Sequence, residues 1–273
     1  MKCSLFKTIE KRKRTMMTPR VAAIHDMSGF GRCSLTVAIP ILSAMGVQCC
    51  PLPTAFLSTH TGGFEGFTFL DMTDEMSKVA DHWASLGLTF QAVYSGFLGS
   101  ERQIGVVENF ICRFRGPDTV VVVDPVMVAT SGSKLLRDDA VQALTEKLLP
   151  MAEVVTPNIP EAEILSGMKI TDAAGMEAAA KLISEKYHCA VLCKGGHQIN
   201  DADDLLWRDG CGKWFRGKRI ANPNTHGTGC TLSSAIASNL AKAAIWTPRW
   251  SGPRPTFPAA CPPCWIWATA PAP

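Results

Sequence analysis

The sequence predicts an α/β fold in which a doubly wound, mostly parallel sheet is flanked by helices on both faces. Two observations support this prediction. Short apolar runs with the composition of strands alternate with longer helical patterns along most of the chain, which is the order of βαβ units. One of these runs, at residues 119–124, is almost continuously β-branched, as is typical of a central parallel strand that is buried on both faces.

The individual elements follow from the same patterns, with strands at short apolar runs and helices where apolar residues recur at helical spacing. In the first half, strands are predicted at residues 21–24, 47–51 and 119–124, and residues 92–100 are predicted to form a strand that ends in a ligand-facing loop. Helices are predicted at residues 35–45 and 73–87. In the second half, helices are predicted at residues 138–149 and 173–186, strands at 154–155 and 190–193, and a hairpin at 203–206 and 213–219. A polar glycine turn then opens into a small-residue helix within residues 222–240.

Length and composition indicate one globular domain with an apolar core. The chain has 273 residues, of which 47% are hydrophobic and 19% charged, and its net charge of +3 implies no nucleic-acid partner. Its 11 cysteines are odd in number and irregularly spaced, which favours reduced thiols in a cytoplasmic protein over a disulfide framework. No apolar run approaches the roughly 20 residues of a membrane helix, so we expect no membrane partner.

The two ends of the chain differ from its centre. Residues 1–19 contain a basic run at 11–14 and no apolar segment, which predicts a disordered basic extension. The domain itself is expected at residues 20–242. Residues 243–273 hold eight of the 18 prolines and four of the seven tryptophans but no Asp, Glu or Lys. That composition opposes helix formation and leads to the hypothesis of an aberrant tail produced by a frameshift.

The most specific local signal is the glycine turn before the last predicted helix. Gly227 and Gly229 permit a close approach of the backbone to a ligand, and the N–H groups of the first helical turn favour phosphate. Cys230 lies at the start of that helix, where a base would stand beside a bound phosphate. The alternative is an ordinary helix N-terminus, in which Thr228 or Thr231 caps the helix and the glycines only turn the chain.

Polar residues also follow several predicted strands, where open α/β sheets bind ligands. Asp124 ends the strand at residues 119–124, and Lys194 and Gly195 follow the strand at residues 190–193, within reach of a nucleotide phosphate.

A third polar group follows the short strand at residues 154–155. Thr156, Asn158 and Glu161 belong to the string Thr-Pro-Asn-Ile-Pro-Glu at residues 156–161. This string fits a ligand site and fits equally well a helix N-cap with a carboxylate in the first turn.

The first predicted strand leads into a glycine loop and then a helix, which is the build of a βα ligand-binding unit. Gly29 and Gly31 invite a dinucleotide interpretation, but Ser34 stands where the fingerprint requires its third glycine. Further along the chain, His60 is flanked by threonines and is interpreted as a ligand-binding histidine rather than a base. Phe97 is open to two interpretations, stacking on a ring or packing in the core.

Three motifs occur in the order expected for one known family. They are Asp-Pro-Val-Met at residues 124–127, Thr-Pro-Asn-x-x-Glu at 156–161 and Asn-Thr-His-Gly-Thr-Gly-Cys-Thr-Leu-Ser-Ser-Ala at 224–235. Together they resemble the hydroxymethylpyrimidine kinases of the ribokinase-like superfamily. Ser-Thr-His-Thr-Gly at residues 58–62 and Tyr-Ser-Gly-Phe-Leu-Gly-Ser at 94–100 resemble the pyridoxal kinase branch instead.

The resemblance implies transfer of the ATP γ-phosphate to a hydroxymethyl group on a nitrogen heterocycle by a homodimeric enzyme that uses Mg²⁺. It places the catalytic groups at Cys230, Gly227, Thr228 and Gly229, with Cys230 deprotonating or orienting the hydroxyl. It places the acceptor against Asp26, Ser28, His60, Thr61 and Phe97. It places ATP against Asp124, Thr156, Asn158, Glu161, Lys194 and Gly195, with Asp124 and Glu161 near the metal, directly or through water.

The identity of the acceptor can be predicted from the loops that are expected to bind it. Pyridoxal kinases of the usual type carry Asp where this chain has Cys230, whereas the pyrimidine kinases and some bacterial vitamin B6 kinases carry Cys. Because the loops expected to bind the acceptor resemble the vitamin B6 branch, we expect pyridoxal, pyridoxamine or pyridoxine, with hydroxymethylpyrimidine as the alternative. A catalytically silent binding protein, damaged by the aberrant tail, is the alternative from another class.

Overall fold

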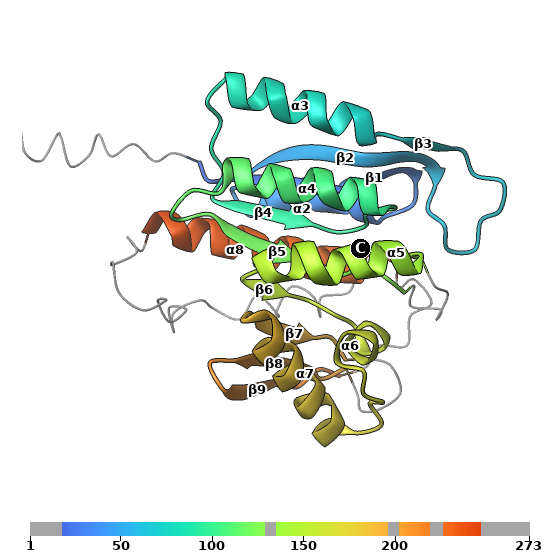
Figure 1. The fold of residues 1–273 in the computed structure, drawn as a ribbon, viewed down its shortest axis with the longest axis vertical. Helices are drawn as coiled ribbons and strands as arrows, with labels where there is room; N and C mark the ends of the chain where they lie inside the picture. The colour runs from blue at the N-terminus through green and yellow to red at the C-terminus, as the bar shows by residue number, and fades with distance from the viewer. Residues whose placement is uncertain (1–17, 129–134, 196–201, 219–225, 247–273) are drawn as a thin grey trace, which may run out of the picture.

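The computed structural model describes residues 18–128, 135–195, 202–218 and 226–246 (Figure 1). The strands are β1 (Arg20–Phe30), β2 (Gln48–Thr59), β3 (Phe69–Asp71), β4 (Ala92–Ser95), β5 (Val120–Val123), β6 (Val154–Val155), β7 (Ala190–Cys193), β8 (Asp204–Arg208) and β9 (Cys211–Phe215). The α-helices are α2 (Ser34–Ala44), α3 (Thr73–Ser85), α4 (Glu101–Phe114), α5 (Asp138–Ala143), α6 (Ile159–Ser166), α7 (Ala173–Tyr187) and α8 (Thr228–Trp246). A π-helical turn (Leu144–Leu148) and a 3-10 turn (Leu149–Met151) continue α5.

Within the described part of the chain, nine strands form one sheet in the order β3-β2-β1-β4-β5-β6-β7-β8-β9. The strands from β2 to β7 in this order are parallel, whereas β3 at one edge and β8 and β9 at the other are antiparallel. The chain moves from β1 to β2 on one side and later returns to β4 on the other side of β1. This change of direction is a topological switch point, and open α/β sheets bind ligands beside the carboxyl ends of the strands there.

Alternating side chains of the central strands face two separate apolar layers. In β5, Val121 and Val123 belong to one layer and Val120 and Val122 to the other, because successive strand residues point to opposite faces. Helices α3 to α7 contribute buried side chains to the first layer, and α2 and α8 to the second. In Figure 1, α3, α4, α5 and α7 lie in front of the sheet and α8 lies behind it. The predicted doubly wound α/β fold is therefore confirmed.

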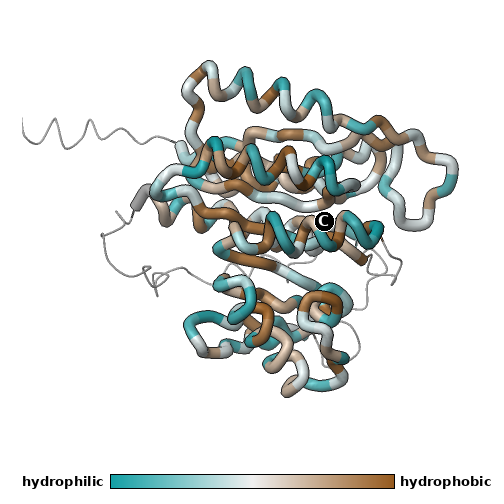
Figure 2. Tube along the Cα trace, viewed as in Figure 1, coloured by the Kyte–Doolittle hydropathy of each residue, from teal (hydrophilic) through white to brown (hydrophobic). Residues whose placement is uncertain are grey.

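The hydropathy of the trace agrees with this layering. Figure 2 shows hydrophobic residues in the central strands and an alternation of hydrophilic and hydrophobic residues along α3 and α4. Such an alternation is expected for helices that bury one face against a sheet and expose the other.

The first strand is longer than predicted. The sequence analysis ended it at residue 24 before a glycine loop, but β1 continues to Phe30 because β2 runs beside it and pairs with it as far as Thr59. A register shift between His25 and Met27 interrupts this pairing. Gly29 therefore lies in a strand and not in the tight turn of a dinucleotide-binding loop, so the dinucleotide interpretation is wrong.

The prediction that the second strand ends at residue 51 is also wrong, because β2 continues to Thr59 through its pairing with β1 and β3. Most other predicted elements lie close to their predicted positions, and β6 and β7 match them residue by residue. The strand and following loop predicted at residues 92–100 are observed as β4 and the loop that leads to Ser100, but the sequence analysis missed α4. That helix begins after Ser100, whose side chain accepts a hydrogen bond from the amide of Gln103. α8 continues past the predicted domain end at residue 242 to Trp246.

The predicted extension and tail lie mostly outside the described residues, which begin at residue 18 and end at 246. Within the described ranges none of the cysteines forms a disulfide, and the reduced state stays a prediction. None of the helices in those ranges has both the length and the apolar character required to cross a bilayer.

Phe110 of α4 allows a test of the larger apolar layer. It is 1% exposed, and its ring centroid lies 4.5 Å from that of Phe114 and 5.8 Å from that of Phe90. We expect Phe110→Ala to lower the free energy of unfolding by about 3–5 kcal/mol, because lost burial and a new cavity add. Urea denaturation measures this loss. Cys112→Ala on the exposed side of α4 is the control, and a similar loss in both variants would contradict the assignment.

Candidate active site

The polar residues singled out in the sequence converge at the carboxyl ends of the central strands. Asp124 directly follows β5, Thr156 follows β6 and Lys194 follows β7. These strands are parallel neighbours, so their carboxyl ends share one edge of the sheet. α8 begins at the same edge, where Ser233 bonds to Asp124. The fold therefore assembles one site from segments far apart in the sequence.

Gly227 forms the turn that leads into α8. The amide of Thr231 donates to its carbonyl at 2.8 Å, which is an α-helical bond. Gly227 has a φ of +80°, and a Cβ at this position would lie 1.9 Å from the carbonyl oxygen of Arg32, so only glycine fits. Thr228, Gly229 and Cys230 form the first turn, where the helix dipole favours an anion. Residues 222–225 of the motif lie outside the described residues.

Next to this turn lies a buried ion pair between Asp124 and Lys194. Nζ of Lys194 lies 2.8 Å from Oδ1 of Asp124, and the Ser233 hydroxyl donates to Oδ2 at 3.1 Å. The hydroxyl oxygens of Thr156 and Ser233 are 3.0 Å apart and extend the network. A Cβ on Gly229 would lie 3.4 Å from Nζ of Lys194, so the backbone of the turn passes close to the ion pair.

Neighbouring carboxylates stabilise the charged form of Lys194. Burial opposes that charge, but Asp124 and Glu161 outweigh burial and raise the pKa of Lys194 above its ordinary value. Lys194 is therefore a cation beside a glycine turn, an arrangement that suits a phosphate. The adjacent Gly195 donates its amide to Asp204 at 2.8 Å, and its contact with a nucleotide stays a prediction.

Asn158 and Glu161 form a capping box at the start of α6. The Asn158 side chain accepts from the amide of Glu161 at 2.9 Å, and the Glu161 carboxylate accepts from the amide of Asn158 at 2.8 Å. The other carboxylate oxygen accepts from the amide of Met127 at 3.2 Å. The helix-cap interpretation is thus realised. Burial raises the pKa of Glu161 to about 7, a shift that Lys194 opposes and Asp124 reinforces.

Asp124 and Glu161 are the residues that would hold Mg²⁺. Among the described residues, no group of three or more His, Cys, Asp and Glu side chains is arranged to bind a metal. Two carboxylates nonetheless suit Mg²⁺, which keeps several waters and takes few protein oxygens. The charge of Asp124 helps to raise the pKa of Glu161, and a divalent cation between the two carboxylates would offset that effect. These residues therefore fit the predicted metal, whose binding stays a prediction.

On the other side of the turn, Cys230 faces a buried histidine that the sequence analysis missed. Sγ of Cys230 lies 3.7 Å from Nε2 of His25, and Nδ1 of His25 lies 2.7 Å from Oδ1 of Asp26. His25 is 2% exposed. Asp26 also accepts hydrogen bonds from Ser34 at 2.6 Å and Ser28 at 3.2 Å. The thiol, the imidazole and the carboxylate thus form a continuous polar chain.

His25 and Asp26 each stabilise the charged form of the other. Burial would lower the pKa of His25, but Cys230 and Asp26 raise it well above its ordinary value. Burial likewise opposes ionisation of Asp26, whereas His25, Ser34 and Ser28 together lower the pKa of Asp26. A signal for His25 was present in the sequence, since it immediately precedes Asp26 at the end of an apolar run.

The remaining residues predicted to bind the acceptor lie around the same edge. The His60 ring centroid lies 4.4 Å from that of His226, which immediately precedes Gly227. Thr61 is exposed beside it. Phe97 packs against the larger apolar layer, and its amide nitrogen lies 3.3 Å from Nδ1 of His25. The core interpretation of Phe97 is thus realised, and the contacts of these residues with an acceptor stay predictions.

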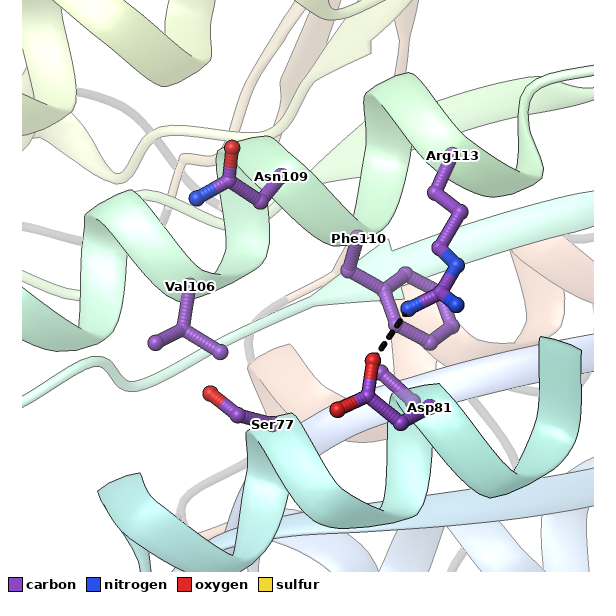
Figure 3. A pocket seen from close by; sticks show the side chains of 7 residues that line it. Ser77, Asp81, Val106, Asn109, Phe110 and Arg113 are labelled. Carbon is purple, nitrogen blue, oxygen red and sulfur yellow. Dashed lines mark hydrogen bonds and ion pairs between the residues drawn. The ribbon is translucent and has the colours of Figure 1, made fainter.

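A separate hollow lies between α3 and α4 (Figure 3). An ion pair of 2.5 Å between Asp81 and Arg113 bridges it, and Phe110 lies at its base. None of the residues predicted to bind substrate or ATP lines this hollow. The active-site hypothesis therefore rests on the edge of the sheet.

Comparison with known proteins identifies the family. A model described as phosphomethylpyrimidine kinase matches residues 39–247. This chain belongs to the phosphomethylpyrimidine kinase family. A hydroxymethylpyrimidine/phosphomethylpyrimidine kinase of Rhizobium meliloti is 38% identical over 228 residues, which cover 83% of this chain and 84% of the relative. The Haemophilus influenzae protein of the same name is 42% identical over 152 residues, which span 54% of this chain and 56% of the relative.

Solved structures of family members and pyridoxal kinases share the fold. A putative phosphomethylpyrimidine kinase from Bacteroides thetaiotaomicron, in a form with pyridoxal, is 37% identical, with a TM-score of 0.72 over 83% of this chain and 81% of that chain. The ADP complex of Bacillus subtilis pyridoxal kinase is 26% identical, with a TM-score of 0.75 over 84% and 88% of the two chains. The predicted resemblance to ribokinase-like vitamin kinases is confirmed.

Gly96 leaves the space that the His25 ring fills. A Cβ on Gly96 would lie 1.9 Å from Cδ2 and 2.1 Å from Nε2 of His25. We expect Gly96→Ala to lower the free energy of unfolding by about 1–3 kcal/mol, because the ring must move away from Cys230. Urea denaturation measures the change. Gly99→Ala is the matched control, since a Cβ there would meet its nearest neighbour at 3.7 Å, and equal losses would argue against this packing.

Glu161 predicts a pH dependence of stability. Its pKa rises from 4.5 to about 7 on folding, so between these values the folded state holds a proton that the unfolded chain releases. The free energy of unfolding contributed by Glu161 therefore decreases as pH rises through this window. Glu161→Gln, which is uncharged throughout, should reduce the decrease between pH 5 and pH 7.

Urea denaturation at the two pH values, without nucleotide or Mg²⁺, measures this effect. The difference between the pH values is the relevant quantity, because Gln also loses one acceptor of the capping box at both. Glu146→Gln on the exposed surface is the control and should keep the wild-type pH dependence. An unchanged pH dependence in Glu161→Gln would show that Glu161 does not hold this proton.

Proposed function

We propose that this chain transfers the γ-phosphate of ATP to the hydroxymethyl group of hydroxymethylpyrimidine, and then a second γ-phosphate to the phosphate group of the resulting monophosphate. The observation that carries the proposal is the position of Cys230 in the first turn of α8. The preceding residue, Gly229, borders the Asp124–Lys194 ion pair. A potential base and a phosphate-binding environment are thus held within one helical turn. The relatives from Rhizobium meliloti and Haemophilus influenzae, both named for this reaction, support the choice of acceptor.

Each part of the site has a role in this proposal. Cys230 removes or orients the proton of the attacking hydroxyl, and the amides of Gly227 to Cys230 stabilise the transferring phosphoryl group. Lys194 holds the phosphates by its charge, and Asp124 and Glu161 hold Mg²⁺. Mg²⁺ supplies neutralisation of the phosphate charge when it is bound.

Vitamin B6 is the second candidate acceptor, and the sequence analysis ranked it first. The pyridoxal in the Bacteroides thetaiotaomicron structure supports it, because that protein is 37% identical to this chain. The motif at residues 58–62 also supports it, since His60 lies beside His226 at the glycine turn. The named relatives nevertheless favour the pyrimidine, so we rank pyridoxal, pyridoxamine and pyridoxine second.

The homodimer implied by the resemblance is also a proposal. Exposed apolar side chains occur on the β1, β2 and β3 side of the sheet and offer a surface for a second copy. They are Phe30, Phe56, Phe69 and Leu70. A binding-only protein with a damaged C-terminus is the proposal from another class, and ligand binding without turnover would support it.

A panel of acceptors tests the function directly. The full chain is incubated with ATP, Mg²⁺ and either hydroxymethylpyrimidine, its monophosphate, pyridoxal, pyridoxamine or pyridoxine, and phosphorylated products are measured by mass spectrometry. We expect the highest kcat/KM with the pyrimidine. A preference for the vitamin B6 compounds would reverse the ranking, and folded protein that binds ligand without turnover would favour the binding-only alternative.

Replacement of Cys230 tests the proposed base. We expect Cys230→Ala to lower kcat by roughly 10²- to 10⁴-fold, because that is the usual effect of losing a general base. The change in KM should be smaller. Steady-state kinetics with the preferred acceptor measures both constants. Cys112→Ala on the surface of α4 is the control. A Cys230→Ala variant that retains near wild-type kcat removes Cys230 from the mechanism.

A further inference from the structure

We propose that His25 and Asp26 form a proton relay with Cys230, in which His25 takes the thiol proton and Asp26 holds the resulting imidazolium. The catalytic use of this relay rests on the proposed kinase function. His25 does not reach the substrate in this proposal, since it acts through Cys230 and is a positioning residue. The relay itself is a property of the folded chain and can be tested without ATP or acceptor.

Distances and burial support the relay. The 3.7 Å between Sγ of Cys230 and Nε2 of His25 is within hydrogen-bonding reach of a sulfur, and the 2.7 Å to Asp26 is a short contact on the opposite nitrogen. The ring is thus bracketed by the two groups on its two nitrogens. Gly96 lies against the ring, so the side chain has little freedom to turn away.

The location of the proton follows from the contacts of Nδ1. The amides of Asp26 and Phe97 donate to Nδ1 at 3.0 and 3.3 Å, and the Asp26 carboxylate lies closer to the same nitrogen, at 2.7 Å. An ionised carboxylate can only accept a hydrogen bond, so the relay requires a proton on Nδ1 at this shortest contact, and that proton displaces the two longer amide bonds. Ser34 and Ser28 donate to the same carboxylate and keep it ionised. A second proton, taken from the thiol by Nε2, then makes the imidazolium.

Other titratable groups border the relay from each neighbouring element. Tyr94 of β4 meets the His25 ring edge-on at 6.2 Å, and Cys33 lies at the N-terminus of α2 near Asp26. Asp124 acts on Tyr94, and Lys194 interacts with Cys230 from the nucleotide side. The interaction with Cys230 is among the contacts that raise the pKa of Lys194.

Two proton transfers take place in the proposed relay, one from Cys230 to His25 and one from the substrate hydroxyl to Cys230. The S–H bond of Cys230 breaks as the N–H bond at Nε2 of His25 forms, which leaves a thiolate and an imidazolium. The thiolate then takes the proton of the substrate hydroxyl while the hydroxyl oxygen bonds to the γ-phosphorus and the bond to ADP breaks. The thiol is thereby restored while His25 still carries the extra proton. The start is regained when the thiol releases one proton to solvent and takes the proton of Nε2 in its place, so that one proton leaves for each phosphoryl group transferred.

The test measures the alkylation rate of Cys230 by iodoacetamide across pH, because only the thiolate reacts. The full chain is alkylated at pH 6.5 and pH 9, and mass spectrometry follows the Cys230 and Cys112 peptides separately. Cys112 is exposed and serves as the internal reference. In the wild type, the ratio of the Cys230 rate to the Cys112 rate should be higher at pH 6.5 than at pH 9.

His25→Gln should lower that ratio at pH 6.5 by about tenfold and leave it near wild type at pH 9, since an unpaired thiol loses about tenfold of its thiolate per pH unit. Gln can donate a hydrogen bond to the sulfur but cannot take its proton. Asp26→Asn provides a second variant and should lower the ratio in the same direction. His82→Gln, on the exposed face of α3, is the matched control and should leave the ratio unchanged.

Two results would overturn the relay. One is a wild-type Cys230 rate that follows the Cys112 rate at both pH values, and the other is a His25→Gln variant with the wild-type ratio at pH 6.5. Unfolding of a variant would be detected as alkylation of the buried Cys189 and Cys193. In that case the wild-type ratio of the Cys230 and Cys112 rates, compared between pH 6.5 and pH 9, would still test the relay. Absence of phosphorylation with an intact relay would instead reject the kinase proposal alone.

Discussion

The Asp124–Lys194 ion pair is the constraint on which the rest of the site depends. Their side chains are 3% and 15% exposed, so both charges are largely removed from water. Loss of Lys194 would leave the Asp124 carboxylate buried without its cationic partner, and removal of one partner from a buried ion pair costs about 3–5 kcal/mol. The hydroxyls of Ser233 and Thr156 complete the network. Because these residues come from β5, β7, β6 and α8, the pair fixes the relative positions of four separate segments.

The small residues of α8 follow from the same constraint. Ser233, Ser234, Ala237, Ser238 and Ala241 are all fully buried. A helix with small side chains on its inner face approaches a sheet closely, whereas larger side chains would hold it further away. A greater separation would move Gly229 away from Lys194, and the glycine turn would no longer lie against the ion pair. The composition of α8 is therefore linked to the chemistry of its first turn.

The sequence predicted the individual residues of the site better than their partnerships. Asp124 and Lys194 were predictable because each follows an apolar strand, where α/β sheets bind ligands. Their contact depends on strand order, which joins positions 70 residues apart in the sequence. His25 was missed because the first strand was predicted to end just before it. The pairing of β1 with β2 continues that strand, and this is a tertiary effect that local propensity does not contain.

The geometry separates the chemistry of the phosphate from that of the acceptor. On one side of the α8 turn, Lys194 provides positive charge beside the carboxylates of Asp124 and Glu161, as phosphates and a divalent cation require. On the other side, Cys230 faces His25, with hydrogen-bonding groups suited to handling a proton. Neither arrangement depends on the size or substitution of the heterocycle that carries the hydroxyl. In the proposed mechanism, substitutions in the loops around the edge would therefore change the acceptor while the proposed phosphoryl-transfer groups stay in place. This is compatible with one fold shared by relatives named for pyrimidines and neighbours named for pyridoxal.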